Sequence, residues 1–245
     1  MPGTGLALAI LVALNLLACR SRCGEVELAR IAQWQAMVTS VREPLALASL
    51  RDLGHVGCVD AQRALGIALV EQEPADLQRE GLAWLGRAAE HGSGEAELVL
   101  GKLEMLGGSG VVVDYSRAAS HLRAAANQHE PRASYYLALM ARNGYGQPAD
   151  VRAAAQYLQD AARAELPAAL FLLANAYRNG DGVEHDEKRA LALYRAAAEK
   201  DHPASIQALA MAYRNGELGL APESANSAAM LAELAHSHRH APPQP

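Results

Sequence analysis

A repeat of 36 residues constrains the fold of this 245-residue chain more than any other feature of its sequence. The tripeptide Arg-Asn-Gly begins at Arg142 and recurs at Arg178 and Arg214. The same step separates three prolines, three Leu-Ala pairs and three aspartates: Pro131, Pro167 and Pro203; Leu137, Leu173 and Leu209; Asp114, Asp150 and Asp186. A period of this length is typical of stacked two-helix units, each of which buries its apolar face against its neighbours.

Residues 168–203 show how one unit is expected to fold. The first helix is predicted over residues 168–179, because apolar residues there follow the i, i+3, i+4, i+7 spacing of one helical face. These residues are Leu170, Leu173, Ala174 and Tyr177. Gly180 and Gly182 are expected to end the helix, since glycine adopts positive φ without steric cost.

A second helix is predicted over residues 187–200, with Asp186 as its N-cap and Pro203 stopping its continuation. Its inner face is expected to contain Ala190, Leu193, Ala197 and Ala198. Pairs of alanines near the end of this helix recur in three units, as Ala125-Ala126, Ala161-Ala162 and Ala197-Ala198. Such small side chains let successive units approach closely, and a larger side chain would overpack the contact.

The pattern extends over five units, at residues 59–94, 95–131, 132–167, 168–203 and 204–240. Upstream, two helices are predicted over 24–41 and 43–55, and they are expected to form an atypical capping pair. Alanine contributes 52 residues, whereas Phe occurs once and Trp twice, a balance that favours helix over sheet. The sequence therefore predicts an all-α fold, an αα-hairpin solenoid of about five repeats over 59–240 with an N-terminal helical cap.

The repeat unit resembles the Sel1-like repeats, a tetratricopeptide-related family of helical pairs. The resemblance is carried by Leu-Gly or Leu-Ala, then Tyr, Gly-x-Gly-Val, Asp and Ala-Ala. It is strongest where Gly182-Val183 precedes Asp186 and Gly110-Val111 precedes Asp114. It implies a right-handed superhelix with the first helix of each unit on the concave side. An extended groove of this kind implies protein binding rather than an enclosed catalytic pocket.

The N-terminal segment is predicted to be a targeting signal. Residues 6–18 are apolar except for Asn15, and this run is too short to span a bilayer. The segment Leu16-Leu17-Ala18-Cys19 resembles the lipobox of bacterial lipoproteins, although the start of the chain lacks Lys and Arg. The resemblance implies a signal peptide over 1–18 and lipid on Cys19. An ordinary cleaved signal or a buried N-terminal helix is the alternative interpretation.

A lipidated Cys19 implies a periplasmic protein that is anchored to the membrane through its N-terminus. The lipidated N-terminus and the helical cap together form the predicted segment 19–58. Residue 20 is Arg rather than Asp, which favours the outer over the inner membrane. In an exported protein Cys23 and Cys58 either form a disulfide or remain two free thiols, one of them buried. Spacing alone does not decide between these alternatives.

No motif of a hydrolase, phosphate-binding loop or metalloprotease occurs in the chain, so we expect no enzyme, no cofactor and no metal. Gly107, Gly108 and Gly110 lack the Lys and Ser or Thr of a phosphate loop and predict a turn. The alternating histidines His236, His238 and His240 indicate either a metal site or a disordered segment. The tail 241–245 that follows them is predicted to be disordered. A net charge of −5 argues against non-specific binding to nucleic acid.

A candidate partner-binding column lies on the first helices of three units, at positions not required for packing between helices. It consists of Tyr135, Leu139, Arg142, Phe171, Asn175, Arg178, Gln207, Met211 and Arg214. Aromatic, Met and Arg side chains are common at binding hot spots. Two alternatives stay open: the arginines serve only to stabilise helix C-termini, and Phe171 packs within the protein.

The family resemblance narrows the expected function further. Short Sel1-repeat lipoproteins of Gram-negative bacteria include immunity proteins against phospholipase effectors that type VI secretion delivers to the periplasm. The expected partner is then such an effector, gripped in the groove so that its substrate is excluded. The alternative is a periplasmic scaffold for an envelope or polysaccharide-export assembly. Both hypotheses rest on analogy at the level of the fold.

Overall fold

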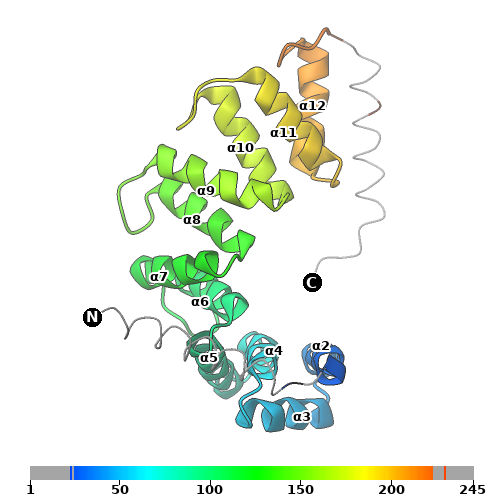
Figure 1. Cartoon of the computed structure of the whole chain (residues 1–245), viewed down its shortest axis with the longest axis vertical. Coiled ribbons are helices and arrows are strands. Elements are labelled where there is room, and N and C mark those ends of the chain that lie inside the picture. The colour runs from blue at the N-terminus through cyan, green and yellow to red at the C-terminus, as the bar shows by residue number, and fades with distance from the viewer. Residues whose placement is uncertain (1–22, 24, 223–228, 230–245) are drawn as a thin grey trace, which may run out of the picture. The chain divides into compact units, whose positions relative to one another are not determined.

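A computed structural model describes residue 23, residues 25–222 and residue 229, and residues 25–27 are described by their backbone alone. Within these ranges the chain forms eleven α-helices and no strand, which confirms the predicted all-α repeat fold (Figure 1). The helices are α2 (Glu25–Val41), α3 (Pro44–His55), α4 (Val59–Val70), α5 (Ala75–Glu90), α6 (Gly94–Leu106), α7 (Tyr115–Asn127), α8 (Pro131–Asn143), α9 (Val151–Arg163), α10 (Pro167–Asn179), α11 (Glu187–Ala198) and α12 (Pro203–Asn215).

The helices pair as hairpins, α4 with α5, α6 with α7, α8 with α9 and α10 with α11. We call the first member of each pair, and α12, an A helix, and the second member a B helix. The chain divides after Glu130 into two compact units, so that α2–α7 belong to the first unit and α8–α12 to the second.

Local chemistry sets the ends of the helices. Asp114, Asp150 and Asp186 cap α7, α9 and α11, each accepting a backbone N–H of the first turn at about 3.0 Å. Gly180 ends α10 in the left-handed conformation, with φ +77°. Each A helix from α8 onward begins at the repeated proline itself, one residue earlier than predicted. Proline lacks an N–H and therefore fits the first helical position, where that donor has no intrahelical partner.

Small side chains bring the helices together. The first alanine of each predicted pair, Ala125, Ala161 and Ala197, is fully buried. In the second unit Ala161 packs with Leu158 and Leu173, and Ala197 lies on the inner face of α11. Gly182 approaches its neighbour so closely that an added Cβ would lie 2.0 Å from the carbonyl oxygen of Val151. In this turn the backbones of two successive repeats are therefore in close contact.

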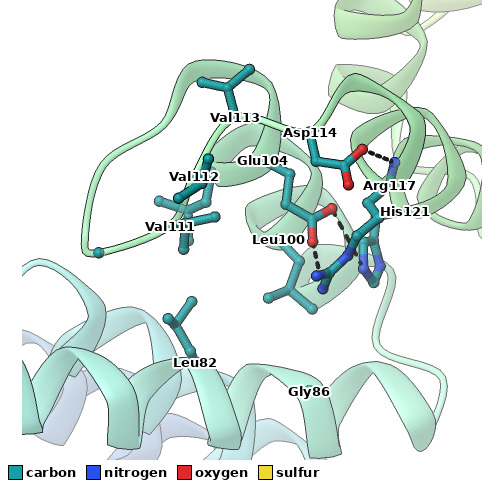
Figure 2. A pocket seen from close by; sticks show the side chains of 12 residues that line it. Leu82, Gly86, Leu100, Glu104, Val111, Val112, Val113, Asp114, Arg117 and His121 are labelled. Carbon is teal, nitrogen blue, oxygen red and sulfur yellow. Dashed lines mark hydrogen bonds and ion pairs between the residues drawn. The ribbon is translucent and has the colours of Figure 1, made fainter. Parts of the chain in front are cut away.

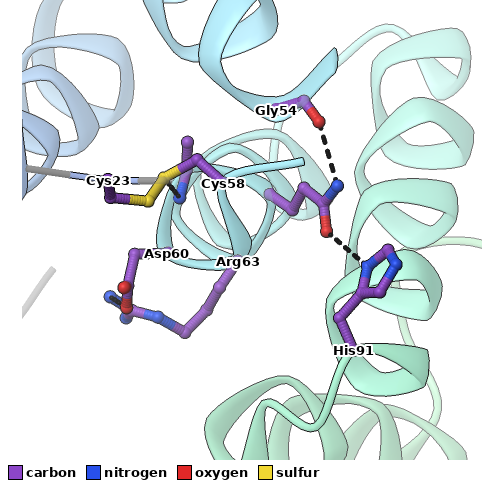
Figure 3. The surroundings of a disulfide bond; sticks show 8 residues. Cys23, Gly54, Cys58, Asp60, Arg63 and His91 are labelled. Atoms are coloured by element: carbon purple, nitrogen blue, oxygen red, sulfur yellow. Dashed lines mark hydrogen bonds and ion pairs between the residues drawn. A yellow bond between two sulfur atoms is a disulfide. The ribbon is translucent and has the colours of Figure 1, made fainter. Parts of the chain in front are cut away.

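The N-terminal cap is confirmed as two helices, α2 and α3, which pack against α4. Ile31, Leu50 and Leu65 are among the buried residues of this core. A disulfide joins Cys23 to Cys58 over a Cα–Cα distance of 5.5 Å, directly before α4 (Figure 3). The sulfur of Cys58 also accepts a hydrogen bond from the backbone N–H of Ala61 at 3.4 Å.

Several predictions fall outside the described residues. They are the signal peptide 1–18, lipidation of Cys19, the tail 241–245, the histidines His236, His238 and His240, and most of the second helix of the last unit. None of the described helices is long and apolar enough to cross a membrane.

Candidate functional site

The nine residues of the predicted column all lie in the second unit, on the A helices α8, α10 and α12. Their exposure differs along the column. Arg142, Arg178, Arg214, Gln207 and Met211 are exposed, and Met211 retains 50% of its accessible surface. Tyr135, Leu139, Phe171 and Asn175 are half-buried. The column is thus a mixture of surface side chains and side chains that also serve packing.

Phe171 adopts the packed alternative. Its ring lies 5.9 Å from the ring of Tyr194 on α11 and 5.1 Å from that of His202, between ring centroids. Burial lowers the pKa of His202, which favours the neutral imidazole beside the phenyl ring. Phe171 therefore helps to join α10 to the start of the next repeat, and only part of its surface faces solvent.

Asn175 and Arg178 are also tied into the second unit. The hydroxyl of the fully buried Tyr194 donates to Oδ1 of Asn175 at 2.5 Å, and burial raises the pKa of Tyr194. Arg178 Nη2 lies 2.8 Å from Oε2 of Glu217, which follows the next A helix. Of the three arginines in the column, Arg178 therefore forms an ion pair within the protein, and this pair joins one repeat to the next.

The equivalent position one repeat earlier is arranged differently. Arg142 and Asp181, which correspond to Arg178 and Glu217, line a cavity of about 60 Å³ together with Asn175. This volume is that of about two water molecules. Arg142 itself is exposed beside this small cavity, and no ion pair with Asp181 matches the one between Arg178 and Glu217 among the contacts of the described residues.

The side chains most available to a partner lie at the C-terminal end of the column. On α12, Gln207, Met211 and Arg214 occupy one exposed face at i, i+4 and i+7. Tyr135 on α8 packs its ring edge-to-face on Tyr136 at 5.5 Å, and burial raises its pKa. Leu139 lies half-buried one turn further along α8.

A second candidate site, which the sequence pattern did not indicate, lies in the first unit. A cavity of about 560 Å³ opens between α5, α6 and the loop that joins α6 to α7 (Figure 2). Its walls include the valines of that loop and the polar side chains Glu104, Arg117 and His121. Aligning the chain's own repeats would have revealed it, because these residues depart from their counterparts in the later repeats. Among the described residues no cluster of three or more His, Cys, Asp or Glu side chains is arranged to hold a metal ion.

Comparison with solved structures supports the fold. The chain is similar to a Sel1 repeat protein from Oxalobacter formigenes, with a TM-score of 0.75 and 24% identity over 86% of this chain and 88% of the other. It is also similar to c5321, a protective antigen of uropathogenic Escherichia coli with an SLR fold, with a TM-score of 0.72 and 22% identity over 85% of this chain. The match covers 45% of c5321. No curated protein sequence matches the chain.

The Sel1 repeat model matches the sequence five times, at residues 59–93, 94–129, 131–166, 167–202 and 203–236. The boundaries of the first four matches agree with the helical pairs, the fifth match begins with α12, and the matches cover most of the chain. Sel1 repeats generally mediate protein–protein interaction and are typically non-catalytic. The chain belongs to the Sel1 repeat family.

Proposed function

We propose that this chain is an envelope-anchored protein-binding module, and more specifically an immunity protein that binds a phospholipase effector delivered to the periplasm by type VI secretion. Binding would occlude the effector, so that phospholipid no longer reaches its active site. The observation that carries the proposal is the exposed face of α12, where Gln207, Met211 and Arg214 lie together on a repeat of a protein-binding family. Met and Arg are enriched in interface cores.

Two features support an envelope location. The segment Leu16-Leu17-Ala18-Cys19 resembles a lipobox, and several acyl chains on Cys19 would anchor the protein firmly. The disulfide between Cys23 and Cys58 supports export, since such bonds persist mainly outside the cytosol. In cells that express the full chain, Cys19→Ser is expected to move the protein from the membrane fraction to the soluble fraction. Retention of this variant in the membrane would contradict the lipid anchor.

The proposed inhibition is tested with purified phospholipase effectors acting on phospholipid vesicles. We expect the full chain to block fatty-acid release at an equimolar ratio with one effector and to co-elute with it. Met211→Ser and Arg214→Gln are each expected to weaken the complex about tenfold. Arg152→Gln provides the matched control, because Arg152 is an exposed arginine on a B helix of the same unit.

The outcomes separate the hypotheses. An effector that binds both α12 variants as tightly as the wild type would contradict the assignment of this face. A chain that inhibits no phospholipase, yet co-purifies stoichiometrically with an envelope or polysaccharide-export assembly, would support the scaffold instead. Turnover of a lipid by the chain alone would contradict a purely binding role.

A further inference from the structure

The cavity of the first unit has the size of a ligand site. Its volume of about 560 Å³ lies within the range that holds a small molecule or a side chain with its neighbours. Figure 2 shows Leu82 of α5 and Leu100 of α6 pointing toward each other across it, with Val111, Val112 and Val113 along one side. All these walls belong to the same compact unit.

Two residues of the valine wall, Val112 and Val113, are an anomaly within the chain's own repeats. At the positions of Val111, Val112 and Val113 the next repeat has Gln147-Pro148-Ala149, and the one after it has Val183-Glu184-His185. Val112 keeps 84% of its surface exposed and Val113 keeps 43%. Repeat packing does not require valine at these two positions, since the later repeats fold with Pro148 and Ala149 or with Glu184 and His185 there. Exposed neighbouring valines beside a cavity indicate contact with an apolar group of a partner.

The other end of the cavity carries a carboxylate where later repeats place Ala141, Tyr177 and Tyr213. Glu104 is only 4% exposed. Its Oε1 lies 2.8 Å from Arg117 Nη2, whereas its Oε2 has no hydrogen-bond donor and lies 3.7 Å from His121 Nε2. Burial raises the pKa of Glu104. A half-satisfied buried carboxylate is costly, so its presence at this position points to a role outside repeat packing.

The charges around Glu104 do not balance. Asp114, whose Oδ1 also accepts the backbone N–H groups of Ser116 and Arg117, adds a second carboxylate to the lining of the cavity. Against these two acidic groups the lining has one permanent cation, Arg117, and the imidazole of His121, whose Nδ1 lies 2.5 Å from Oε2 of Glu97 outside the lining. The charged end of the cavity is therefore acidic, and a cationic group would complete it.

We infer that this cavity binds a basic, apolar segment of a partner protein: a branched apolar side chain packs between the valine wall and Leu82 and Leu100, and a neighbouring lysine or arginine lies beside Asp114 and Glu104. The inference rests on the proposed protein-binding function and names the chemistry that the first unit recognises. An apolar wall alone would accept any hydrophobic segment, whereas the acidic end selects the cationic one.

Three short peptides test this inference against the full chain, with apolar and charged residues alternating as isoleucine–lysine, isoleucine–glutamate and alanine–lysine. Binding is followed by NMR of valine and leucine methyl groups. Only the isoleucine–lysine peptide is expected to shift the methyl signals of Leu82, Leu100 and Val111. Val112→Ser and Glu104→Gln are each expected to weaken its binding about tenfold. Val41→Ser, a change at another exposed valine (68%) on α2 of the same unit, is the matched control.

Each outcome is informative. Equal shifts from the isoleucine–glutamate peptide would refute the acidic selection, and equal shifts from the alanine–lysine peptide would refute the apolar contact. Absence of any shift at millimolar peptide would overturn the inference as a whole. Since Val112 is on the surface, loss of binding in Val112→Ser cannot be ascribed to unfolding. A chain that binds the peptide but inhibits no phospholipase would contradict only the proposed function. A chain that inhibits a phospholipase but does not bind the peptide would contradict only the proposed role of this cavity.

Discussion

Gly182 offers a sharp test of the way the third and fourth repeats stack, when compared with Gly180 in the same turn. Both glycines have left-handed backbones, with φ +73° and +77°. A Cβ at residue 182 would lie 2.0 Å from the carbonyl oxygen of Val151 and 2.5 Å from its carbonyl carbon. A Cβ at residue 180 would have its nearest neighbour at 3.7 Å, the Cβ of His185. Alanine at either site meets the same backbone strain, but only at 182 does it meet another helix.

The two substitutions therefore separate strain from steric overlap. The left-handed conformation costs an ordinary residue about 1–2 kcal/mol, which is the loss expected for Gly180→Ala. Gly182→Ala adds overpacking against the backbone of α9, which typically costs about 1–3 kcal/mol, for a total of about 2–5 kcal/mol. The overlap cannot be relieved by rotating a side chain, because the atoms that it meets are backbone atoms.

The assay is urea unfolding of the two variants and the wild type, followed by far-UV circular dichroism. We expect Gly182→Ala to lose at least about 1 kcal/mol more than Gly180→Ala. Equal losses would refute the reasoning, because the turn after α10 would then not touch the start of α9. A lower m-value for Gly182→Ala alone would indicate that the second unit has become partly unfolded before the main transition.

Three further predictions follow from single contacts. Reducing the Cys23–Cys58 disulfide, which closes a separation of 35 residues, is expected to lower the free energy of unfolding by about 3–4 kcal/mol, with no effect of reductant on Cys23→Ser; an equal effect of reductant on that variant would contradict this. Hydrogen bonds from Arg51 hold the pKa of Glu80 below its ordinary value of 4.5, so their contribution to stability is present above that pH and is lost as the pH falls through the lowered pKa. Glu80→Gln should therefore flatten the acid limb of stability against pH, and an unchanged limb would exclude this pair as its cause. Asp201 has φ +57°, a conformation that glycine adopts without steric cost. Asp201→Gly is therefore expected to raise the free energy of unfolding by about 1 kcal/mol in thermal unfolding. A lower free energy of unfolding would show that the contacts of the Asp201 side chain stabilise the fold more than its backbone conformation destabilises it.

The features of this fold that the sequence predicts are those that depend on local chemistry. Asp186 caps α11 because a carboxylate accepts backbone N–H groups wherever a helix begins, and Gly180 ends α10 because it adopts positive φ without steric cost. The buried alanines repeat because the same close contact repeats. Each of these patterns is visible at a step of 36 residues.

The features that the sequence left open or missed depend on neighbours distant in sequence. Arg178 is paired because Glu217 lies 39 residues further along the chain, and Phe171 is half-buried because Tyr194 and His202 lie against it. The sequence left the packing of Phe171 open and did not predict the pair of Arg178 with Glu217, since the periodic pattern describes one helix and not the next repeat. The left-handed residues His129, Glu165 and Asp201 also escaped notice, although they recur every 36 residues, because none of them is glycine.

The cavity of the first unit was missed for a related reason. A glutamate on a helix, such as Glu104, is expected on the surface. Its burial depends on the contact of α6 with Arg117 and His121 of α7, which the pattern within one helix does not describe. The partner-binding surfaces remain proposals for the same physical reason. Exposure and charge describe what a surface offers, whereas affinity also depends on the shape of the partner.

Hydrogen–deuterium exchange of the full chain, with and without a bound phospholipase effector, locates the surface that the partner covers. We expect slower exchange in the complex on the A helix α12 and in the loop around Val112, with little change on the B helices α9 and α11. Protection confined to α9 and α11, or no protection in a complex that demonstrably forms, would contradict this expectation.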